Sequence, residues 1–499
     1  MEVKRESKRL IKTNVADGSK EVALSPSDLV VPRVHVEIIY AFEAPVPSDA
    51  SQMLEDALAT TLLDYEEWAG RMSKDSDGRP VIALNGQGAA WIDAEANVPL
   101  RDLMPFPPGY QLLELVPPNR GAEELLLVQV TKFSCGGITL GIARHHQVAD
   151  GESSSQFMDA WTWAVKKKGA VSDEKLPPPP PSPLHDRSLL MASDPPQPTF
   201  EHAEYKKPAP PNPEQQQQQQ AEHPPLAIKK LHFGPELLKK IKSEAMKDLQ
   251  DGAWFTTFES LTAHLWRCIT RARGLAGGTD TRALVATNGR PRLKTRKLPA
   301  NYFGNVIFHA CSQASVDDLT GRPLSYAAGL VQTAIRRVDE EYILSALDFT
   351  ALQLQHPVPV ARGHRTVLSP NLSVTSWAGL PLYKTDFGWG TPLFVGPPLI
   401  PFEGLLMLLP SYTQDGAIDA SVGLFAPDME RLESFAFQLS EKRVSFSVSV
   451  SEEKLKQSCS ENEEEHADFV CELSSIIVIV TMHYDIVTMQ CATGLFLVA

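Results

Sequence analysis

Two adjacent histidines and an aspartate four residues after the second could carry out proton-transfer chemistry. His145 and His146 end an apolar run, and Asp150 stands directly before Gly151, where an apolar-periodic segment begins. A neutral imidazole at the end of a rigid strand can act as a general base, because its ordinary pKa lies near neutral pH. The pattern therefore predicts that one imidazole points into a cavity as a base, while Asp150 holds the loop or an arginine beneath it.

Two other interpretations of these residues involve no catalysis. The histidines can be strand-end side chains satisfied by hydrogen bonds, with Asp150 as the cap of the following helix, a position where Asp is common. The side chains of His145, His146 and Asp150 could also bind a metal ion. Neighbouring strand residues point to opposite faces, however, and make a poor shared chelate, so we expect no metal site.

The apolar pattern predicts the elements that must position these side chains. Residues 125–130 and 138–143 are rich in β-branched and aliphatic side chains, which is typical of strands. An amphipathic pattern predicts a helix over residues 51–68. An Asn-Gly pair, which favours positive φ angles, predicts a hairpin over residues 80–94. Further helices are expected from residue 231 to 245 and from 319 to 342.

A second motif, Asp386-Phe387-Gly388-Trp389-Gly390, lies far downstream of the first. Together with the HxxxD pattern of His146 and Asp150, it resembles the plant BAHD family of acyl-CoA-dependent acyltransferases. HxxxD alone also resembles the condensation-domain and chloramphenicol-acetyltransferase pattern, whereas both motifs in this order are specific. The resemblance covers residues 1–440, includes Asn301-Tyr302-Phe303-Gly304-Asn305, and is strongest to the hydroxycinnamoyl-CoA transferases.

The resemblance implies an α/β fold of two similar chloramphenicol-acetyltransferase-like domains. Mixed sheets would be flanked by helices, with an active-site tunnel at the interface. The length agrees, because 499 residues exceed the size at which one hydrophobic core usually divides. We expect an N-terminal acyltransferase domain over residues 1–174, a Pro/Gln-rich crossover linker over 175–226, a C-terminal acyltransferase domain over 227–441 and an atypical tail over 442–499.

Composition changes sharply in the linker, where prolines recur and six glutamines stand in a row at 215–220. Such a segment buries too little apolar surface to offset its ordering entropy, so we expect it to be exposed and largely disordered. His185 and His202 lie within it and are assigned no chemical role. The tail is apolar near its end, but the run from Ile476 to Met482 is interrupted too soon to span a bilayer.

The resemblance also implies roles for single side chains. Asp150 is expected to pair with an arginine, for which Arg290 is the candidate and Arg292 the alternative. The motif that begins at Asp386 is expected to hold the domain architecture, away from the catalytic centre. The remaining expected roles are an oxyanion or acyl pocket at Thr375 and Trp377, acceptor binding by Arg362, coenzyme A binding by Lys239, Thr256 and Thr257, and structural support by Asp386, Gly388, Trp389 and Gly390.

Composition limits the partners and the compartment. The net charge of -14 argues against nucleic acid or an anionic membrane as the main partner. The six cysteines are scattered without a CxxC pair, as in proteins of a reducing compartment, and the charged start of the chain lacks the apolar core of a secretory signal. We expect a cytoplasmic monomer whose partners are acyl-CoA and a small-molecule acceptor.

The implied reaction is transfer of a hydroxycinnamoyl group from its CoA thioester to that acceptor, as in plant phenylpropanoid metabolism. His146 would take the acceptor's proton as its hydroxyl or amine attacks the thioester carbonyl. CoA thiolate is a good leaving group, so acyl-CoA is a co-substrate, and neither a bound cofactor nor a covalent intermediate is required. The alternative of a different class is a non-catalytic interaction protein, against which the intact His146, Asp150 and Asp386 argue.

The acceptor is indicated by two conflicting resemblances. Residues 39–42 and 64–70 look like the grass enzymes that acylate agmatine or putrescine. Arg362 and the intact Trp389 look instead like the shikimate and quinate type, in which an arginine at this position binds the acceptor's carboxylate. A guanidinium binds a carboxylate bidentately and repels a diamine cation. We favour a shikimate- or quinate-type hydroxyl, with an amine as the alternative.

Overall fold

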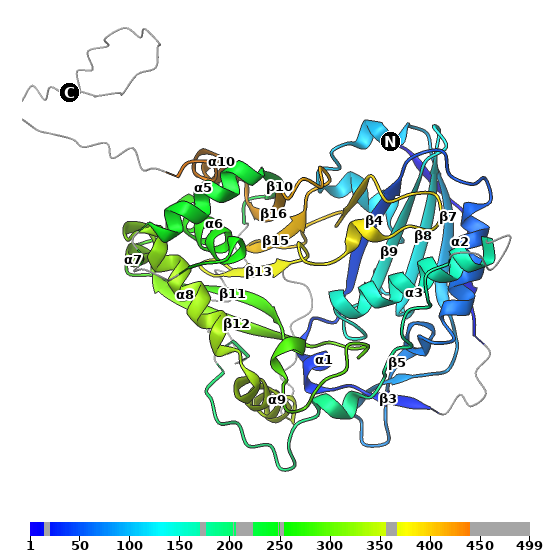
Figure 1. Cartoon of the computed structure of the whole chain (residues 1–499), viewed down its shortest axis with the longest axis horizontal. Coiled ribbons are helices and arrows are strands. Elements are labelled where there is room, and N and C mark those ends of the chain that lie inside the picture. The colour runs from blue at the N-terminus through cyan, green and yellow to red at the C-terminus, as the bar shows by residue number, and fades with distance from the viewer. Residues whose placement is uncertain are drawn as a thin grey trace, which may run out of the picture. The chain divides into compact units, whose positions relative to one another are not determined.

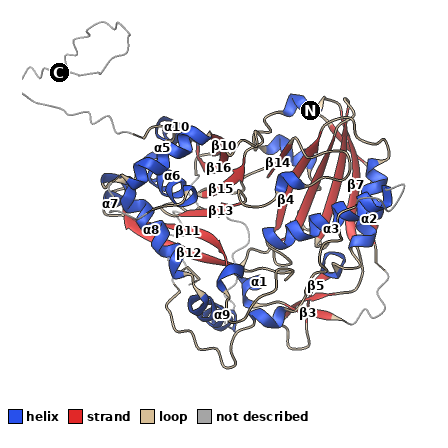
Figure 2. Cartoon of the chain, viewed as in Figure 1, coloured by secondary structure: helices blue, strands red, loops and turns tan. Residues whose placement is uncertain are grey.

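Most strands of the first half of the chain form one sheet in the computed structural model, which describes residues 1–13, 20–169, 176–202, 204–205, 223–247, 249, 254–355 and 367–439. This seven-stranded sheet has the order β1-β7-β8-β9-β4-β14, with β2 beside β7 (Figures 1 and 2). Its strands are β1 (Val3–Arg5), β2 (Arg9–Ile11), β4 (His35–Phe42), β7 (Ala89–Ala96), β8 (Leu126–Phe133), β9 (Ile138–His145) and β14 (Phe394–Gly396). The strands β8 and β9 confirm the two predicted before the histidines.

Two amphipathic helices, α2 (Ala50–Thr61) and α3 (Gly151–Gly169), lie along one face of this sheet (Figure 1). The ring of Trp161 in α3 meets that of Trp91 in β7 edge to face, with centroids 6.4 Å apart. The buried side chains of α3 recur at the spacing of one helix face, and include Phe157, Met158, Trp161, Ala164 and Val165. This packing fixes the start of α3, and the loop before it, against the sheet.

A separate three-stranded sheet shows that the predicted hairpin is wrong. It consists of β3 (Glu21–Ala23), β6 (Pro80–Ala83) and β5 (Arg71–Lys74), whereas β7 belongs to the larger sheet. The Asn-Gly pair thus connects two sheets, and does not join two paired strands. The connection passes close to β2, because a Cβ at Gly88 would lie 2.5 Å from the carbonyl oxygen of Ile11.

The second half of the chain forms a six-stranded mixed sheet in the order β10-β16-β15-β13-β11-β12. Its strands β11, β13 and β15 run parallel to one another, and the other pairs are antiparallel. The strands are β10 (Leu226–Phe233), β11 (Asp280–Asn288), β12 (Ile307–Ser315), β13 (Leu372–Ser376), β15 (Leu405–Pro410) and β16 (Ile418–Phe425). The accompanying helices are α5 (Pro235–Met246), α6 (Thr257–Arg273), α7 (Val316–Gly321), α8 (Leu324–Arg337), α9 (Glu340–Gln355) and α10 (Ala426–Phe435).

Three predicted helices have different bounds. The helix expected over residues 51–68 ends at Thr61, and a 3-10 turn, η1 (Glu66–Ala69), follows it. The helix expected from residue 231 starts only at Pro235, because the preceding residues pair with β16 as β10. The helix expected over 319–342 is divided into α7, α8 and α9. Pro323 stands at the start of α8, where its missing amide proton and fixed φ do not interrupt a helix.

Residues 1–437 form one compact unit, in which a segment from the second half of the sequence joins the sheet of the first half. The strand β14, from the second half, pairs with β4 of the first half. Leu382 and Phe387, which precede β14, are buried in the core cluster that includes Trp68, Trp91 and Trp161. The seven-stranded sheet is therefore complete only with residues from both halves.

The described part of the linker, residues 176–202, has many exposed residues, as predicted, but it also has ordered contacts with the rest of the protein, which were not predicted. Leu184 forms a β-bridge with Tyr302, and the 3-10 turn η4 (Arg187–Leu190) follows it. Arg187, Leu190 and His202 are buried. The glutamine tract and residues 442–499 lie outside the described residues, among which no helix is long and apolar enough to cross a membrane.

Candidate active site

His146 stands just beyond the end of β9, and its backbone is held on both sides. Its amide donates to the carbonyl oxygen of Val34 at 2.9 Å, and its carbonyl accepts from Asn305 Nδ2 at 3.0 Å. The ring is half-buried, and its Nδ1 has no hydrogen-bond partner among the described residues. Burial lowers the pKa of His146 below its ordinary value of 6.5, so the imidazole is neutral near pH 7 and can accept a proton.

His145 occupies a different environment, although it is the adjacent residue. It pairs with His35 of β4, and the two rings meet edge to face with centroids 5.4 Å apart. Burial, followed by the charges of its neighbours, lowers the pKa of His145 to about 4. Both imidazoles are therefore neutral at pH 7, and their positions distinguish them: His145 ends the strand, whereas His146 begins the loop that Asp150 closes.

Asp150 is a buried carboxylate that bridges the two halves of the chain. Its Oδ2 accepts from Arg290 Nη1 at 2.7 Å and from the Val306 amide at 2.9 Å. Its Oδ1 accepts from Arg290 Nη2 at 3.1 Å and from the Ser153 amide at 2.9 Å. Burial alone would raise the pKa of Asp150, but the Arg290 charge and these hydrogen bonds hold it below its ordinary value. The carboxylate is thus ionised and occupied by donors that anchor the loop.

The same contacts show that Asp150 both caps α3 and pairs with an arginine, so the two interpretations of this residue are compatible. The bond from the Ser153 amide makes Asp150 the cap of α3, as in the non-catalytic interpretation. The bidentate pair with Arg290 is the contact implied by the family resemblance. Arg292 instead donates to the carbonyl oxygens of Ile335 and Val338, at 2.8 and 2.6 Å.

The carboxyl ends of two parallel strands bring Arg290 and Trp377 to the same edge of the six-stranded sheet. Val285 of β11 lies opposite Val374 of β13, so the residues after both strands leave the sheet side by side. Thr375 is half-buried on β13, and Trp377 packs against the core of the seven-stranded sheet. Leu380 lies 2.8 Å from where a Cβ on Gly151 would stand. The segment that follows Thr375 therefore contacts the first residue of α3.

The motif that begins at Asp386 forms a closed turn on α3. Asp386 Oδ1 accepts from the amides of Gly388 and Gly390, at 2.8 and 3.0 Å, and both glycines have positive φ. Asp386 Oδ2 pairs with Lys166 Nζ of α3 at 2.9 Å. The carboxylate thus holds the turn closed and attaches it to the helix that follows the His146 loop.

Aromatic rings bury the middle of this turn. Phe387 is 1% exposed and meets Phe42 and Trp161 edge to face, with centroids 5.8 and 5.6 Å apart. Trp389 stacks on Phe387 at 5.6 Å. These contacts pack the turn against β4 and α3.

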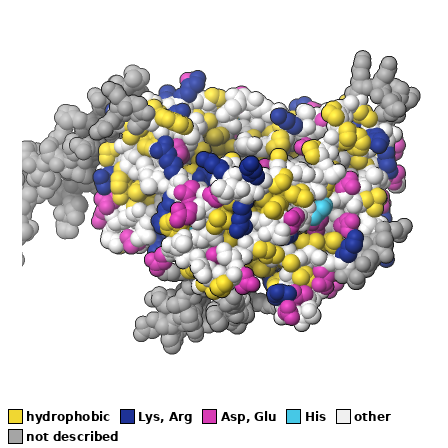
Figure 3. All heavy atoms as spheres, turned by 60° about the horizontal axis from the view of Figure 1, so that its bottom comes forward, with side chains coloured by type: hydrophobic (Ala, Val, Ile, Leu, Met, Phe, Trp, Pro, Cys, Tyr) yellow, Lys and Arg dark blue, Asp and Glu magenta, His cyan; other side chains and the backbone are white. Residues whose placement is uncertain are grey.

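The residues expected to bind coenzyme A lie on α5 and at the start of α6. Lys239 is exposed and pairs with Glu236 at 2.7 Å. The Thr256 hydroxyl caps α6 by accepting from the Glu259 amide, and Thr257 is the first residue of that helix. Basic and acidic side chains are interspersed on the face drawn in Figure 3. Arg362, the expected acceptor ligand, lies outside the described residues.

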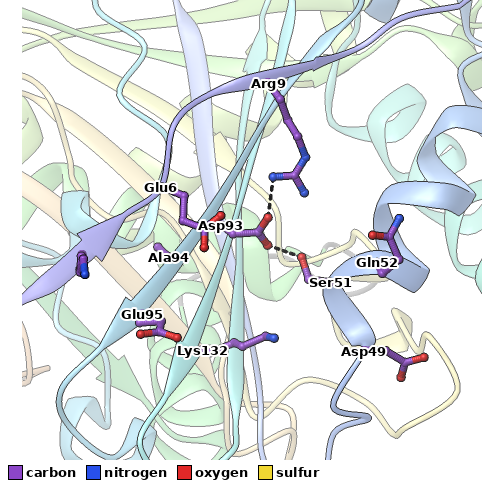
Figure 4. A pocket seen from close by; sticks show the side chains of 10 residues that line it. Glu6, Arg9, Asp49, Ser51, Gln52, Asp93, Ala94, Glu95 and Lys132 are labelled. Carbon is purple, nitrogen blue, oxygen red and sulfur yellow. Dashed lines mark hydrogen bonds and ion pairs between the residues drawn. The ribbon is translucent and has the colours of Figure 1, made fainter.

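A polar pocket of about 330 Å³ lies at the other end of the seven-stranded sheet (Figure 4). Its Lys132 pairs in register with Ile138, the first residue of β9, whereas His145 is the last residue of that strand and His146 follows it. Arg9 and Ser51 point toward Asp93, with which Arg9 forms an ion pair of 2.7 Å. The lining has side chains of both charges and no histidine, so this pocket is separate from the candidate base.

Several side chains that hold the loop were not predicted from the sequence. Asn305 lies within the motif at residues 301–305, but that motif gives it no individual role, and no role is predicted from the sequence for Ser153, Asp28 or Arg187. Ser153 Oγ accepts from Arg290 Nη2 at 2.7 Å, and donates to the Gly304 carbonyl at 2.9 Å. Two sequence signals existed, the polar residue in the first turn of α3 and an arginine in an otherwise Pro-rich segment. Within the described residues, no group of three His, Cys, Asp or Glu side chains could hold a metal ion.

Comparison with known proteins agrees with this geometry. The family model described as Transferase family matches residues 1–439. The chain is 37% identical to agmatine coumaroyltransferase-1 of Hordeum vulgare, over 81% of this chain and 90% of that protein. It is 35% identical to shikimate O-hydroxycinnamoyltransferase of Nicotiana tabacum, over 88% of this chain and 100% of that protein.

Among solved structures, TRI101 of F. sporotrichioides, complexed with coenzyme A and T-2, has the same fold, with a TM-score of 0.63. Its sequence is 18% identical, and the match covers 83% of this chain and 97% of that one. The family match spans both motifs and both sheets, and the fold is the expected α/β arrangement of two sheet-containing domains. The chain therefore belongs to the Transferase family, the BAHD acyltransferases that its HxxxD and DFGWG motifs resemble.

Proposed function

We propose that the protein transfers a hydroxycinnamoyl group from its CoA thioester to a small acceptor, with His146 as the base. The proposal is carried by one observation: a neutral, half-buried His146 begins a loop that the Asp150–Arg290 pair anchors across two sheets. The relatives described above support the acyl group, because one transfers a coumaroyl and the other a hydroxycinnamoyl group. Both are plant proteins, which supports a role in phenylpropanoid metabolism.

The reaction needs a base, an oxyanion donor and a leaving group. His146 takes the proton of the acceptor's hydroxyl or amine as that group attacks the thioester carbonyl. The Trp377 indole or the Thr375 hydroxyl donates to the oxyanion of the tetrahedral intermediate. Collapse of the intermediate breaks the carbon–sulfur bond, and the CoA thiolate receives the proton from the imidazolium. The Asp150 carboxylate remains ionised throughout, since its role is to hold the loop.

The two substrates meet at His146 from opposite ends of a tunnel between the domains, which span residues 1–174 and 227–441. Lys239, Thr256 and Thr257 contact the phosphates of CoA, by charge-assisted bonds in the case of the lysine. The complex of TRI101 with coenzyme A supports CoA as the co-substrate. The protein acts as a cytoplasmic monomer. The described cysteines Cys135, Cys268 and Cys311 are unpaired, as is usual in a reducing compartment.

For the acceptor, we favour the hydroxyl of a shikimate- or quinate-type carboxylate, bound by Arg362. The shikimate enzyme of Nicotiana tabacum supports this choice. The agmatine enzyme of Hordeum vulgare supports the alternative, transfer to an amine. Release of free thiol from p-coumaroyl-CoA tests the function itself. Thiol should appear when shikimate is added, and absence of thiol with every hydroxyl and amine acceptor would refute the proposed reaction.

Replacement of Arg362 by alanine should raise the KM for shikimate by about 10-fold or more, because a hydrogen bond between charged groups contributes ~1.5–3 kcal/mol. The KM for acyl-CoA should change little, since the lost contact is made only to the acceptor. Steady-state kinetics with each substrate varied measures both. Arg365→Ala is the matched control and should leave both constants unchanged. Faster turnover of agmatine or putrescine than of shikimate by the unmodified protein would contradict the assignment.

The pH dependence of kcat/KM should have an acidic limb below 6.5, because burial lowers the pKa of His146 in the free enzyme. The base must be unprotonated, so activity is full above this lowered pKa and is lost as the pH falls through it. Initial rates across the acidic range measure the limb. Return of samples to neutral pH controls for acid inactivation. A limb centred at or above 6.5 would be inconsistent with a buried base.

A further inference from the structure

Arg187 of the linker lies directly beneath the loop that carries His146. Its side chain is 3% exposed. Nη1 donates to Asp28 Oδ1 at 2.9 Å, and Nη2 donates to the carbonyl oxygen of Val148 at 2.8 Å. Val148 stands two residues after His146, in the loop between the histidine and Asp150. A buried guanidinium from a distant segment therefore holds the backbone of the catalytic loop.

A second donor holds the same loop and shares the same carboxylate. Asn305 donates to Asp28 Oδ1 through its amide at 3.0 Å and through Nδ2 at 2.9 Å. The same Nδ2 donates to the carbonyl oxygen of His146 at 3.0 Å. The two carbonyls on either side of Gln147 are thus fixed by donors whose positions Asp28 sets. The Asn305 contact fixes the peptide plane that follows His146. The Arg187 contact holds the loop two residues further on, which limits how far the His146 backbone can shift.

The site beneath the loop has the shape of a planar guanidinium. A Cβ on Gly304 would overlap Arg187 Nη1, so glycine at this position leaves the space that the guanidinium occupies. The rings of Tyr302 and Phe303 have their centroids 6.0 and 5.9 Å from the central carbon of the guanidinium. Lysine could reach one acceptor here, but its single ammonium cannot reproduce the fork that joins Asp28 to Val148.

We infer that Arg187 is a positioning residue for acyl transfer, which orients His146 by holding the Val148 carbonyl. This inference rests on the proposed function, in which His146 is the base. It gives the linker a part in turnover that its proline content does not indicate. Arg187 contacts the loop backbone and does not touch the reacting atoms, so its loss should change the rate of the chemical step more than substrate binding.

Arg187→Lys should therefore lower kcat by about 10- to 100-fold, since a misplacement near 1 Å can cost ~10²-fold in rate. The KM for acyl-CoA should stay within about two-fold, because uniform binding is not altered. The acidic limb of kcat/KM should move to higher pH, because a looser loop admits water and weakens the burial that lowers the pKa of His146. Arg187→Gln, which keeps a planar amide donor, gives the same comparison if the lysine variant does not fold.

Arg273→Lys is the matched control. The Arg273 side chain is 2% exposed, pairs with Glu403 at 2.6 Å, and donates to the Pro370 carbonyl at 3.0 Å. Like Arg187 it donates hydrogen bonds to one carboxylate and one carbonyl, although Arg187 also lies 4.0 Å from the buried Glu67 carboxylate. Neither partner of Arg273 belongs to the catalytic loop. The control should lower the melting temperature to a similar extent, while kcat per folded enzyme and the pH limb stay unchanged.

The experiment separates the two proposals. Thiol release by unmodified protein and by the His146→Ala variant tests the function. The ratio of kcat in the Arg187→Lys variant to kcat in the Arg273→Lys variant tests the positioning role. A large fall in kcat with a shifted pH limb, confined to the Arg187 variants, would support the inference. Equal losses in the two lysine variants, with the limb unmoved, would overturn it and leave Arg187 as a structural ion pair.

Discussion

Replacement of His146 by alanine should lower turnover by ~10²- to 10⁴-fold, the range typical of the loss of a general base. Acyl-CoA binding should persist, because the imidazole acts on the acceptor's proton and does not hold the CoA. Rates of thiol release from p-coumaroyl-CoA measure the first effect, and equilibrium binding of CoA measures the second.

The adjacent histidine supplies the control for this experiment. His145 belongs to β9 and packs on His35, so His145→Ala removes a half-buried ring without removing the base. It should lose much less activity per folded enzyme than His146→Ala. Equal losses in the two variants would show that the base has been assigned to the wrong position in the pair.

Replacement of Arg290 by methionine should reduce the free energy of unfolding by about 3–5 kcal/mol, because it leaves a buried carboxylate without its charged partner. In the Asp150–Arg290 pair the side chains are 2% and 8% exposed. Asp150→Asn should also lower both folded yield and rate, since the same anchor holds the loop. Urea denaturation followed by tryptophan fluorescence measures the stability.

A partly exposed ion pair on α3, the helix that Asp150 caps, provides the comparison. Lys166 and Asp386 are 29% and 31% exposed, and a pair in contact with water contributes at most about 1 kcal/mol. Lys166→Met should therefore have a much smaller effect than Arg290→Met. Equal losses of stability in Lys166→Met and Arg290→Met would contradict this comparison.

The pKa of the Asp150 carboxyl is lowered in the folded protein. Its contribution to stability is therefore present above the pKa of Asp150 in the unfolded chain, and is lost as the pH falls through the folded value.

The parts predicted correctly from the sequence are those set by local patterns. The strands β8 and β9 are predicted by runs of β-branched and aliphatic side chains, and α3 is predicted by the periodic spacing of its apolar residues. The HxxxD and DFGWG motifs identified the family, because each requires specific residue types within a few positions. Local patterns also correctly placed Asp150 at the cap of α3.

The parts missed depend on contacts between residues far apart in the sequence. The Asn-Gly pair predicts a turn, but the strand that follows it joins another sheet, where it pairs with β2 and β8. Proline content predicts an extended linker, and it says nothing of a single arginine whose partners lie at Asp28 and Val148. The pKa values of His145 and His146 do not show which of the two is the base, because burial lowers both.

The pairing of β14 with β4 affects how the chain can be assembled during synthesis. Residues 39–41 of β4 have their outer edge covered by residues 394–396, which leave the ribosome after most of the chain has been made. Ile39 and Ala41 are fully buried in the finished protein. Until then, β4 presents an apolar strand edge, the kind of template on which nascent chains aggregate. The exposed edge of β4 is therefore covered only after residues 394–396 have been translated, and until then it can pair with other chains.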